Sequence, residues 1–149
     1  MIHLEEVTPD NWRMVNELRV SKEQESFVSP NVRILARAYA YRDEVSEALI
    51  ICNDDEMIGL LFYREWPSSC YILDQFMIDE GFQGMGYARA ALELILNRMK
   101  EHGKYNRVKL CYCKGNEVAV NLFTSIGFYH TYEEDEDDDD DEIIMALDF

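Results

Sequence analysis

Two glycines lie where a strand pattern gives way to a helix pattern, a place where backbone groups can bind a phosphate. Gly84 and Gly86 follow the apolar run Tyr71–Ile78 and precede the helical pattern Tyr87–Lys100. A turn of this kind directs several N–H groups at one point, and the helix dipole adds positive potential there. Glycine has no side chain to keep a phosphate away. The segment Asp79–Arg89 therefore predicts a site for the pyrophosphate of a phosphorylated cofactor.

The residues around these glycines exclude two familiar phosphate-binding motifs. No Lys-Ser or Lys-Thr pair follows them, as a P-loop requires. A dinucleotide fingerprint would have a third glycine or an alanine at Arg89. It would also have an acid about 20 residues further on, where this chain has Lys104, Tyr105 and Asn106. The cofactor is therefore expected to be of another kind.

Length and composition describe one folded domain. The 149 residues are 48% hydrophobic, enough to bury a core, and we expect a single domain over residues 1–149. No apolar stretch reaches the roughly 20 residues that span a bilayer, so no membrane partner is expected. The start of the chain lacks the basic and apolar regions of a signal peptide, and the four cysteines form no Cys-x-x-Cys pair. These features predict a cytoplasmic protein with reduced cysteines and no metal site.

The net charge of −16 is concentrated in one segment. Residues 133–142 are ten consecutive acids, and outside them 20 acidic residues stand against 14 basic ones. This balance argues against a nucleic-acid partner, because binding to phosphates needs clustered lysine and arginine. The run is predicted to be a solvated, flexible loop, with attraction of a cationic substrate as the alternative.

The periodic segments predict an α+β fold, with one central mixed, mostly antiparallel sheet flanked by helices. Strands are predicted over Ile2–Val7, Glu47–Cys52, Met57–Tyr63, Tyr71–Ile78, Val108–Cys113, Phe128–Tyr132 and Ile143–Leu147. Helices are predicted over Trp12–Leu18, Val32–Tyr41, Tyr87–Lys100 and Val118–Ile126. In this arrangement the glycine turn lies at the end of a buried strand.

Two motifs resemble the signatures of the GCN5-related N-acetyltransferase superfamily. Gln83-x-x-Gly86-x-Ala88 is similar to the superfamily's Arg/Gln-x-x-Gly-x-Gly/Ala motif, which binds the pyrophosphate of acetyl-CoA. The segment from Asn116 to Phe128 is similar to its second signature, Asn-x-x-Ala-x-x-Leu-Tyr-x-x-x-Gly-Phe. The resemblance covers nearly the whole chain, and the two motifs stand in the expected order.

This resemblance implies that acetyl-CoA is the cosubstrate and that no metal takes part. The cofactor would enter between two strands that splay apart, Tyr71–Ile78 and Val108–Cys113. Its pantetheine arm would pair with the backbone of the first strand, as an added strand does. The implied cofactor-binding residues are Met77, Ile78, Gln83, Gly84, Met85, Gly86, Tyr87, Ala88, Arg89 and Asn116. Asn116 also suits a plain helix cap, and the two roles are compatible.

A second set of residues resembles bacterial spermidine/spermine and diamine N-acetyltransferases. The pattern Val20-x-x-x-Gln24-x-x-Phe27-Val28 and the segment Phe76–Asp79 carry this resemblance. It implies that Gln24 and Phe27 line the pocket of a small-molecule amine acceptor. The alternative is that they are only a helix-end residue and a core residue.

The residues that would transfer protons match the family's pattern less closely than the cofactor motifs do. Asp74 matches an acidic position of the polyamine enzymes, where a carboxylate can hold a cationic amine or relay its proton; a surface acid is the alternative. Phe123 stands where the superfamily often has a tyrosine that protonates the leaving thiolate, and phenylalanine has no proton to give. Tyr112, Tyr129 and Tyr132 are possible stand-ins, with aromatic packing as their alternative role.

These features predict an enzyme that moves acetyl from acetyl-CoA directly to a primary amine, with a polyamine or diamine as the first expectation for the acceptor. Another small amine, an amino acid or a protein amine is the main alternative. The departure at Phe123 also fits a protein of another class, a degenerate CoA-binding sensor or partner-binding module. A homodimer is expected only by analogy with the fold.

Overall fold

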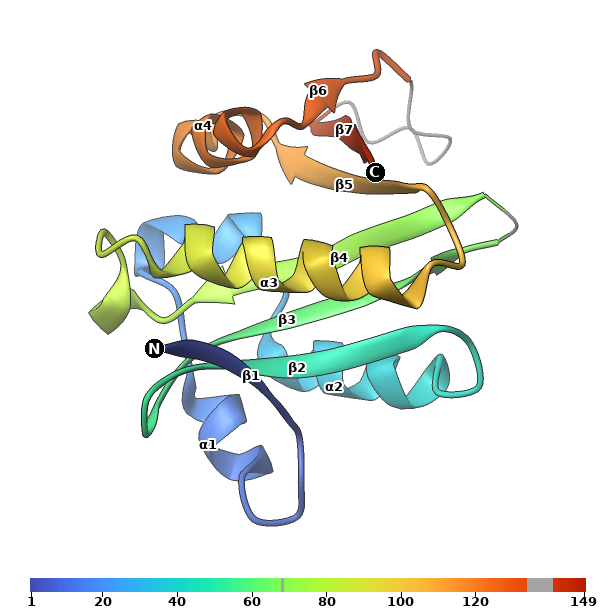
Figure 1. Ribbon diagram of the computed structural model, residues 1–149. Coiled ribbons are helices and arrows are strands. Elements are labelled where there is room, and N and C mark those ends of the chain that lie inside the picture. Colours follow the sequence, from blue (N-terminus) through green and yellow to red (C-terminus); the bar gives the residue numbers. More distant parts are fainter. Residues whose placement is uncertain (68, 134–140) are drawn as a thin grey trace.

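A seven-stranded sheet forms the centre of the computed structural model, which describes residues 1–67, 69–133 and 141–149 (Figure 1). Within those residues the strand order is β1-β2-β3-β4-β5-β7-β6, and β4–β5 is the one parallel pair. The strands are β1 (Ile2–Glu6), β2 (Ser46–Asn53), β3 (Glu56–Trp66), β4 (Cys70–Ile78), β5 (Arg107–Cys113), β6 (Tyr129–His130) and β7 (Glu142–Asp148). The predicted α+β fold with a mixed, mostly antiparallel sheet is confirmed.

Helices cover both faces of this sheet. They are α1 (Trp12–Glu17), α2 (Asn31–Ala40), α3 (Tyr87–His102) and α4 (Glu117–Ile126), with short 3₁₀ helices η1 (Lys22–Phe27) and η2 (Glu80–Phe82). Figure 1 shows α3 lying across one face and α1 and α2 on the other. Alternate residues of each central strand point to opposite faces, so the sheet needs a separate apolar cluster on each side. No helix in the described part of the chain is long and apolar enough to cross a membrane.

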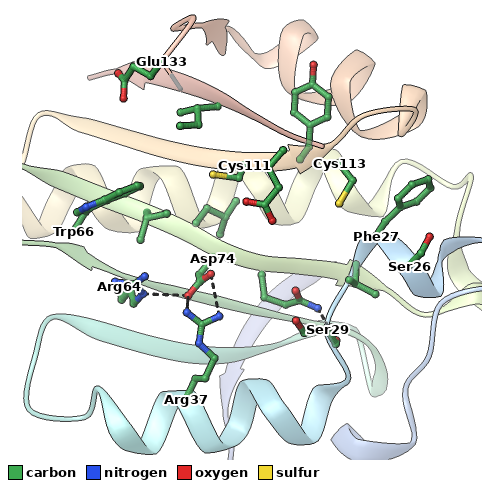
Figure 2. Close-up of a pocket in the computed structure, with 17 residues that line it drawn as sticks. Ser26, Phe27, Ser29, Arg37, Arg64, Trp66, Asp74, Cys111, Cys113 and Glu133 are labelled. Carbon is green, nitrogen blue, oxygen red and sulfur yellow. Dashed lines mark hydrogen bonds and ion pairs between the residues drawn. The ribbon is translucent and has the colours of Figure 1, made fainter. Parts of the chain in front are cut away.

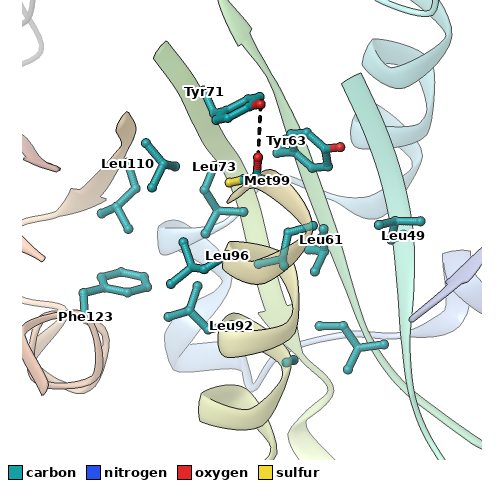
Figure 3. Close-up of a cluster of buried hydrophobic side chains, with 14 of the residues drawn as sticks. Leu49, Leu61, Tyr63, Tyr71, Leu73, Leu92, Leu96, Met99, Leu110 and Phe123 are labelled. Atoms are coloured by element: carbon teal, nitrogen blue, oxygen red, sulfur yellow. Dashed lines mark hydrogen bonds between the residues drawn. The ribbon is translucent and has the colours of Figure 1, made fainter. Parts of the chain in front are cut away.

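Helix α3 buries one apolar stripe against the sheet. Its fully or nearly fully buried residues recur at helical spacing and are Ala91, Leu92, Ile95, Leu96 and Met99. The carbonyl of Met99 also accepts a hydrogen bond of 3.2 Å from the hydroxyl of Tyr71 on β4 (Figure 3). Gly103 ends the helix with φ 73°, a left-handed cap that glycine adopts without strain. The packing of α3 fixes its first turn against the end of β4.

Strands β4 and β5 separate along their length. Their ladder contains only the pairs Tyr71–Val108, Ile72–Lys109 and Leu73–Leu110. Beyond Leu73 the two strands diverge, as Figure 1 shows, and β5 continues instead in its ladder with β7. The edge of β4 that faces β5 is therefore open to another extended chain from residue 74 onward.

The structure differs from the sequence-based expectation in several elements. The helix η1 was not predicted, and the strand predicted over Phe128–Tyr132 is wrong in length, since β6 contains only two residues. The acidic run is not a loop throughout: Glu142 begins β7 opposite Cys113, and Glu133 forms an ion pair with Lys109. Asp141 is a turn residue whose carbonyl accepts a hydrogen bond of 2.7 Å from the N–H of Lys114, and residues 134–140 lie outside the described residues.

Candidate active site

The glycine turn borders a cavity of about 180 Å³ between the end of β4 and the first turns of α3 and α4. We name it the glycine-turn pocket. It brings together most of the predicted cofactor residues: Met77, Ile78, Gln83, Gly84, Gly86, Tyr87, Ala88 and Asn116, together with Gln24, Phe27 and Phe123. Met85 and Arg89 are not among the residues that line it. Met85 is 60% exposed, and the guanidinium of Arg89 donates a 2.8 Å hydrogen bond to Ser125 of α4.

Gly84 and Gly86 have the backbone that the phosphate hypothesis requires. Their φ angles are 78° and 80°, values that other residues rarely adopt. A Cβ atom added at either glycine would meet no protein atom within 4 Å, so the space beside both is open for a ligand. The turn leads directly into the 16-residue helix α3, whose first N–H groups point toward that space. These residues fit a bound pyrophosphate.

Gln83 links the glycine turn to β4 and to η1 through hydrogen bonds. Its Nε2 donates to the carbonyl of Ile78 at 2.8 Å and to Oε1 of Gln24 at 2.9 Å. The amide of Gln24 returns a 3.1 Å bond to Oε1 of Gln83. Since Gln24 also accepts from the backbone of Ser21 in a capping box, η1 is tied to the cofactor turn. The sequence placed both glutamines in the site but did not predict that they bind each other.

Asn116 has the helix-cap role and also lies where the second role, a contact with the cofactor, would place it. Its Oδ1 accepts a 3.3 Å hydrogen bond from the N–H of Ala119, which caps α4, and the residue also lines the glycine-turn pocket. Tyr87 lines the pocket from α3, and its hydroxyl accepts a hydrogen bond of 3.2 Å from Asn53.

A second cavity, of about 590 Å³, lies beside the first. We name it the arginine pocket, after Arg37 and Arg64, which line it. It shares Phe27 and Val28 with the glycine-turn pocket, so the two cavities meet at this segment. Strand β4 runs past both: residues 72–75 line the arginine pocket and residues 76–78 the glycine-turn pocket. The boundary lies just where β4 has left β5.

A β-bulge on β4 directs Asp74 into the arginine pocket. Opposite β3, Phe62 pairs with Gln75 and Tyr63 with Leu73, so Asp74 is an extra residue. A bulge re-aims side chains and is common beside active sites. Here it lets two consecutive side chains face the same side, since Gln75 donates to the carbonyl of Ser29 while Asp74 meets two arginines.

The carboxylate of Asp74 is held by both arginines (Figure 2). Its Oδ2 lies 2.6 Å from Nη2 of Arg37 and 3.1 Å from Nε of Arg64, and Oδ1 accepts a 3.3 Å bond from Nη1 of Arg37. Arg64 also stacks 4.7 Å from the ring centroid of Tyr41. These three charges come from three elements, α2, β3 and β4, and no spacing in the sequence links them.

None of the three candidate stand-ins, Tyr112, Tyr129 and Tyr132, is among the residues that line the glycine-turn pocket beside Phe123. Phe123 is nearly buried and packs against Phe128 at a centroid distance of 5.8 Å. Tyr112 is bonded to His130 at 2.7 Å, and burial together with Glu117 raises the pKa of Tyr112. Tyr129 donates to Asp148 at 2.6 Å, which raises the pKa of Tyr129 in turn.

The remaining candidate stand-in, Tyr132, and the residue His3 lie outside both pockets. Tyr132 is 92% exposed and lines neither pocket. His3 lies with Glu5 and Cys52 on β1 and β2, where their potential ligand atoms are all within 4.8 Å of one another. Those three residues are also outside both pockets.

Comparison with known proteins gives concordant results. The sequence model of the acetyltransferase (GNAT) family matches residues 12–128. A spermine/spermidine N(1)-acetyltransferase of Bacillus subtilis (strain 168) is 27% identical over 136 residues, which are 85% of this chain and 87% of that protein.

Two solved structures share the fold. A spermidine N-acetyltransferase from Vibrio cholerae, in complex with CoA and spermine, superposes with a TM-score of 0.77 at 16% identity, covering 98% of this chain and 94% of that one. An acetyltransferase from Thermus thermophilus gives 0.79 at 19% identity, covering 99% and 97%. The resemblance seen in the sequence is thereby confirmed.

Proposed function

This chain belongs to the acetyltransferase (GNAT) family, and from that premise we propose that it transfers acetyl from acetyl-CoA to a primary amine of a polyamine or diamine. The observation that carries the proposal is the meeting of two pockets at Phe27 and Val28, beside the open edge of β4. One pocket fits the cofactor and the other has room for an acceptor. Their junction is the place where amine and thioester would meet.

The glycine-turn pocket suits acetyl-CoA. The open space beside Gly84 and Gly86 would take the pyrophosphate, and the backbone of Met77 and Ile78 would pair with the pantetheine arm. Met85 and Arg89 would contribute only backbone N–H groups, since their side chains do not line the pocket. Asn116 would offer its amide nitrogen while its oxygen caps α4.

The chemistry is proposed to be a direct attack of the amine, without a covalent enzyme intermediate. Bound acetyl-CoA supplies an activated carbonyl, and a backbone N–H on the open edge of β4 would polarise it. The protein would contribute mainly by holding the amine in line with that carbonyl. The acceptor amine would give up its proton to water, and the leaving sulfur would take one from water because Phe123 has none to give; a thiol has a pKa near 8.5 and needs little help.

Asp74 is proposed to affect acceptor binding indirectly, by fixing the positions of Arg37 and Arg64. A direct role as a base is less favourable, because Arg37 and Arg64 donate to both of its oxygens and would have to be displaced. Gln24 is proposed to act in the same indirect way, by holding the turn through Gln83, whereas Phe27 would contact the acceptor itself.

A polyamine acceptor is supported by the relatives and, modestly, by charge. The described residues that line the arginine pocket carry three carboxylates (Asp74, Glu133 and Glu142) and two guanidiniums. The two arginines also favour one alternative, an acceptor amine that carries a carboxylate, such as an amino acid or a peptide. A cytoplasmic location and a homodimer remain predictions.

A panel of acceptors tests the proposal. The purified protein would be incubated with acetyl-CoA and with spermine, spermidine, 1,4-diaminobutane, amino acids or short peptides, and free CoA would be measured. We expect turnover with polyamines well above the rate of acetyl-CoA hydrolysis. Turnover only with carboxylate-bearing amines would replace the polyamine assignment, and binding of acetyl-CoA without transfer to any amine would restore the sensor hypothesis.

A further inference from the structure

A lysine ammonium group contacts a carboxylate and an indole ring that line one end of the arginine pocket, although the lysine itself, Lys109, lines the neighbouring cavity. Nζ of Lys109 lies 3.0 and 2.9 Å from the two carboxylate oxygens of Glu133. It also lies 5.8 Å from the centroid of the Trp66 ring. Both Glu133 and Trp66 line the pocket, and Figure 2 shows them at the end remote from Phe27.

This end of the pocket has the chemistry that binds a primary ammonium group. A carboxylate forms charge-assisted hydrogen bonds with alkylammonium, and an indole face within about 6 Å attracts the same cation. The side chain of Lys109 is only 18% exposed, so its charge is partly desolvated and depends on these two partners. The terminal group of a polyamine is the same functional group as the end of this side chain.

The separation between this end and the cofactor junction suits a long polyamine. Lys109 lies opposite Ile72 in the β4–β5 ladder, and the two pockets meet between Gln75 and Phe76. The four residue steps from Ile72 to Phe76 span at most about 13 Å. Extended chains of about 13, nine and five bonds, as in spermine, spermidine and 1,4-diaminobutane, reach about 16, 11 and 6 Å. Only the longer acceptors would place one amine at the junction and another near Glu133.

We propose that Trp66 and Glu133 form the subsite for the distal ammonium of the acceptor, and that Lys109 occupies this subsite when no acceptor is bound. The proposal rests on the proposed function, because it presumes a polyamine in the arginine pocket. Lys109 competes with the acceptor for Glu133 and Trp66, and therefore weakens polyamine binding. The subsite itself favours acceptors long enough to reach it, and Lys109 reduces that preference.

The other charged groups of the pocket do not substitute for this subsite. Arg64 lies in the same cross-strand row as Lys109, since both pair with Ile72, and it forms with Arg37 and Asp74 a cluster with one excess positive charge, which repels a cation beside it. Glu142 lines the pocket from β7 and faces the same cavity. A long acceptor would therefore gain most of its binding free energy from contacts at its two ends. The distal subsite provides the contact at one of these ends.

Variants of Lys109 and Glu133 test the proposal through the acceptor KM. Lys109→Met should lower KM for spermine about fivefold, since it removes the competing cation. Glu133→Gln and Trp66→Leu should each raise it by a similar factor, and none should change KM for 1,4-diaminobutane as strongly. Lys104→Met is the matched control: Lys104 is paired with Glu65 at 2.6 Å and lies 5.3 Å from the Tyr105 ring, and neither of these partners lines the arginine pocket.

The double variant tests whether the gain depends on Glu133, and the comparison with 1,4-diaminobutane separates direct binding from general electrostatics. If Glu133 binds the distal ammonium, Lys109→Met/Glu133→Gln should lose the gain that Lys109→Met gives alone. An unchanged or higher spermine KM in Lys109→Met, with the melting temperature maintained, overturns the proposal. So does an equal effect on spermine and 1,4-diaminobutane.

The test remains decisive if the proposed function fails. Should the wild-type protein acetylate no polyamine, the function is wrong, and calorimetric titration with spermine then examines the subsite alone. Tighter spermine binding by Lys109→Met than by the wild type would still support the subsite. Equal affinity, or no binding by either protein, would overturn it.

Discussion

The side-chain amides of Gln24 and Gln83 hold each other through two hydrogen bonds, of 3.1 and 2.9 Å, across 59 positions of the sequence. One glutamine belongs to η1, whose last residue, Phe27, borders both pockets, and the other begins the glycine turn. The pair therefore couples the segment between the pockets to the cofactor turn. Loss of either amide should affect both substrates.

Substitution of these glutamines tests the coupling. Gln24→Ala should raise the dissociation constant of acetyl-CoA about fivefold, because an exposed pair of this kind contributes about 1 kcal/mol to the position of the turn. Gln83→Ala should do at least as much, since it also loses the bond to Ile78. Calorimetry on the two single variants and the double variant gives the interaction energy. Strictly additive effects would show that the pair does not couple the segments.

Gly86→Val should block the approach of the pyrophosphate. The added side chain would fill space that no protein atom occupies, so we expect at least a tenfold weaker binding of acetyl-CoA, about 1.4 kcal/mol. Valine is also strained at φ 80°, and Gly103→Val, at φ 73° on the far end of α3, imposes a similar strain away from the pocket. An equal loss of affinity in both variants would mean that backbone strain, not phosphate access, is responsible.

The parts of the site that short sequence motifs define could be predicted from the sequence. The contacts between residues far apart in the sequence could not. Gln83, Gly86 and Asn116 belong to short motifs whose geometry is set by neighbouring residues. Arg37 and Arg64 reach Asp74 only because a bulge inserts one residue into β4 opposite β3. A bulge is a property of register between two strands, which a single strand's sequence does not reveal.

The ends of elements were missed for a similar reason. Glu142 belongs to an uninterrupted acidic run, so composition predicted a loop, but the ladder between β5 and β7 extends to Cys113 and includes it. Backbone pairing with a neighbouring strand therefore outweighed the local preference of the acid for solvent. The 3₁₀ helix η1 has a capping box, Ser21 with Gln24, that could have been recognised in the sequence.

Phe123→Tyr should raise turnover with a good acceptor, or at least not lower it. The new hydroxyl would enter the glycine-turn pocket, where Tyr87 carries the one hydroxyl among the described lining residues. Phe128→Tyr is the control, because Phe128 packs beside Phe123 but does not line that pocket. A loss of turnover beyond tenfold without loss of stability would show that Phe123 has a role of its own.

The ionisation of Glu65 should make the stability of the folded protein depend on pH. The ammonium of Lys104, then the hydroxyl of Tyr105 and the N–H of Val45, hold the pKa of Glu65 at about 2, below its ordinary value of 4.5. A lowered pKa in the folded state means stability that is present above pH 4.5 and is lost as the pH falls from 4.5 toward 2.

Thermal melting of Glu65→Gln checks this dependence. At pH 7 the variant should melt about 2 °C lower than the wild type, a small shift because the ion pair is partly exposed. The difference should shrink as the pH falls below 4.5. Glu56→Gln removes an exposed acid from the start of β3 and serves as the control. A difference that is constant from about pH 7 to pH 3 would contradict the assignment to ionised Glu65.

Asp74→Asn distinguishes a positioning role from a role as the base. The amide keeps the size of the side chain but leaves Arg37 and Arg64 without their anion, in a setting where their side chains are 33% and 19% exposed. This cluster is intermediate between an exposed and a buried ion pair. We therefore expect the free energy of unfolding to fall by about 1–2 kcal/mol. The acceptor KM should rise for cations, because the pocket gains a positive charge.

The pH profile then decides between the roles. If Asp74 positions the arginines, the acidic limb of kcat against pH should be the same in the wild type and in Asp74→Asn, with kcat reduced by no more than about tenfold. If Asp74 takes the proton of the amine, the variant should lose that limb and fall well beyond tenfold in kcat at every pH. Arg37→Gln separates the two effects further, since it frees one oxygen of Asp74 without removing the carboxylate. A base released in this way should become more active toward the amine, whereas a positioning residue should lose acceptor affinity with kcat unchanged.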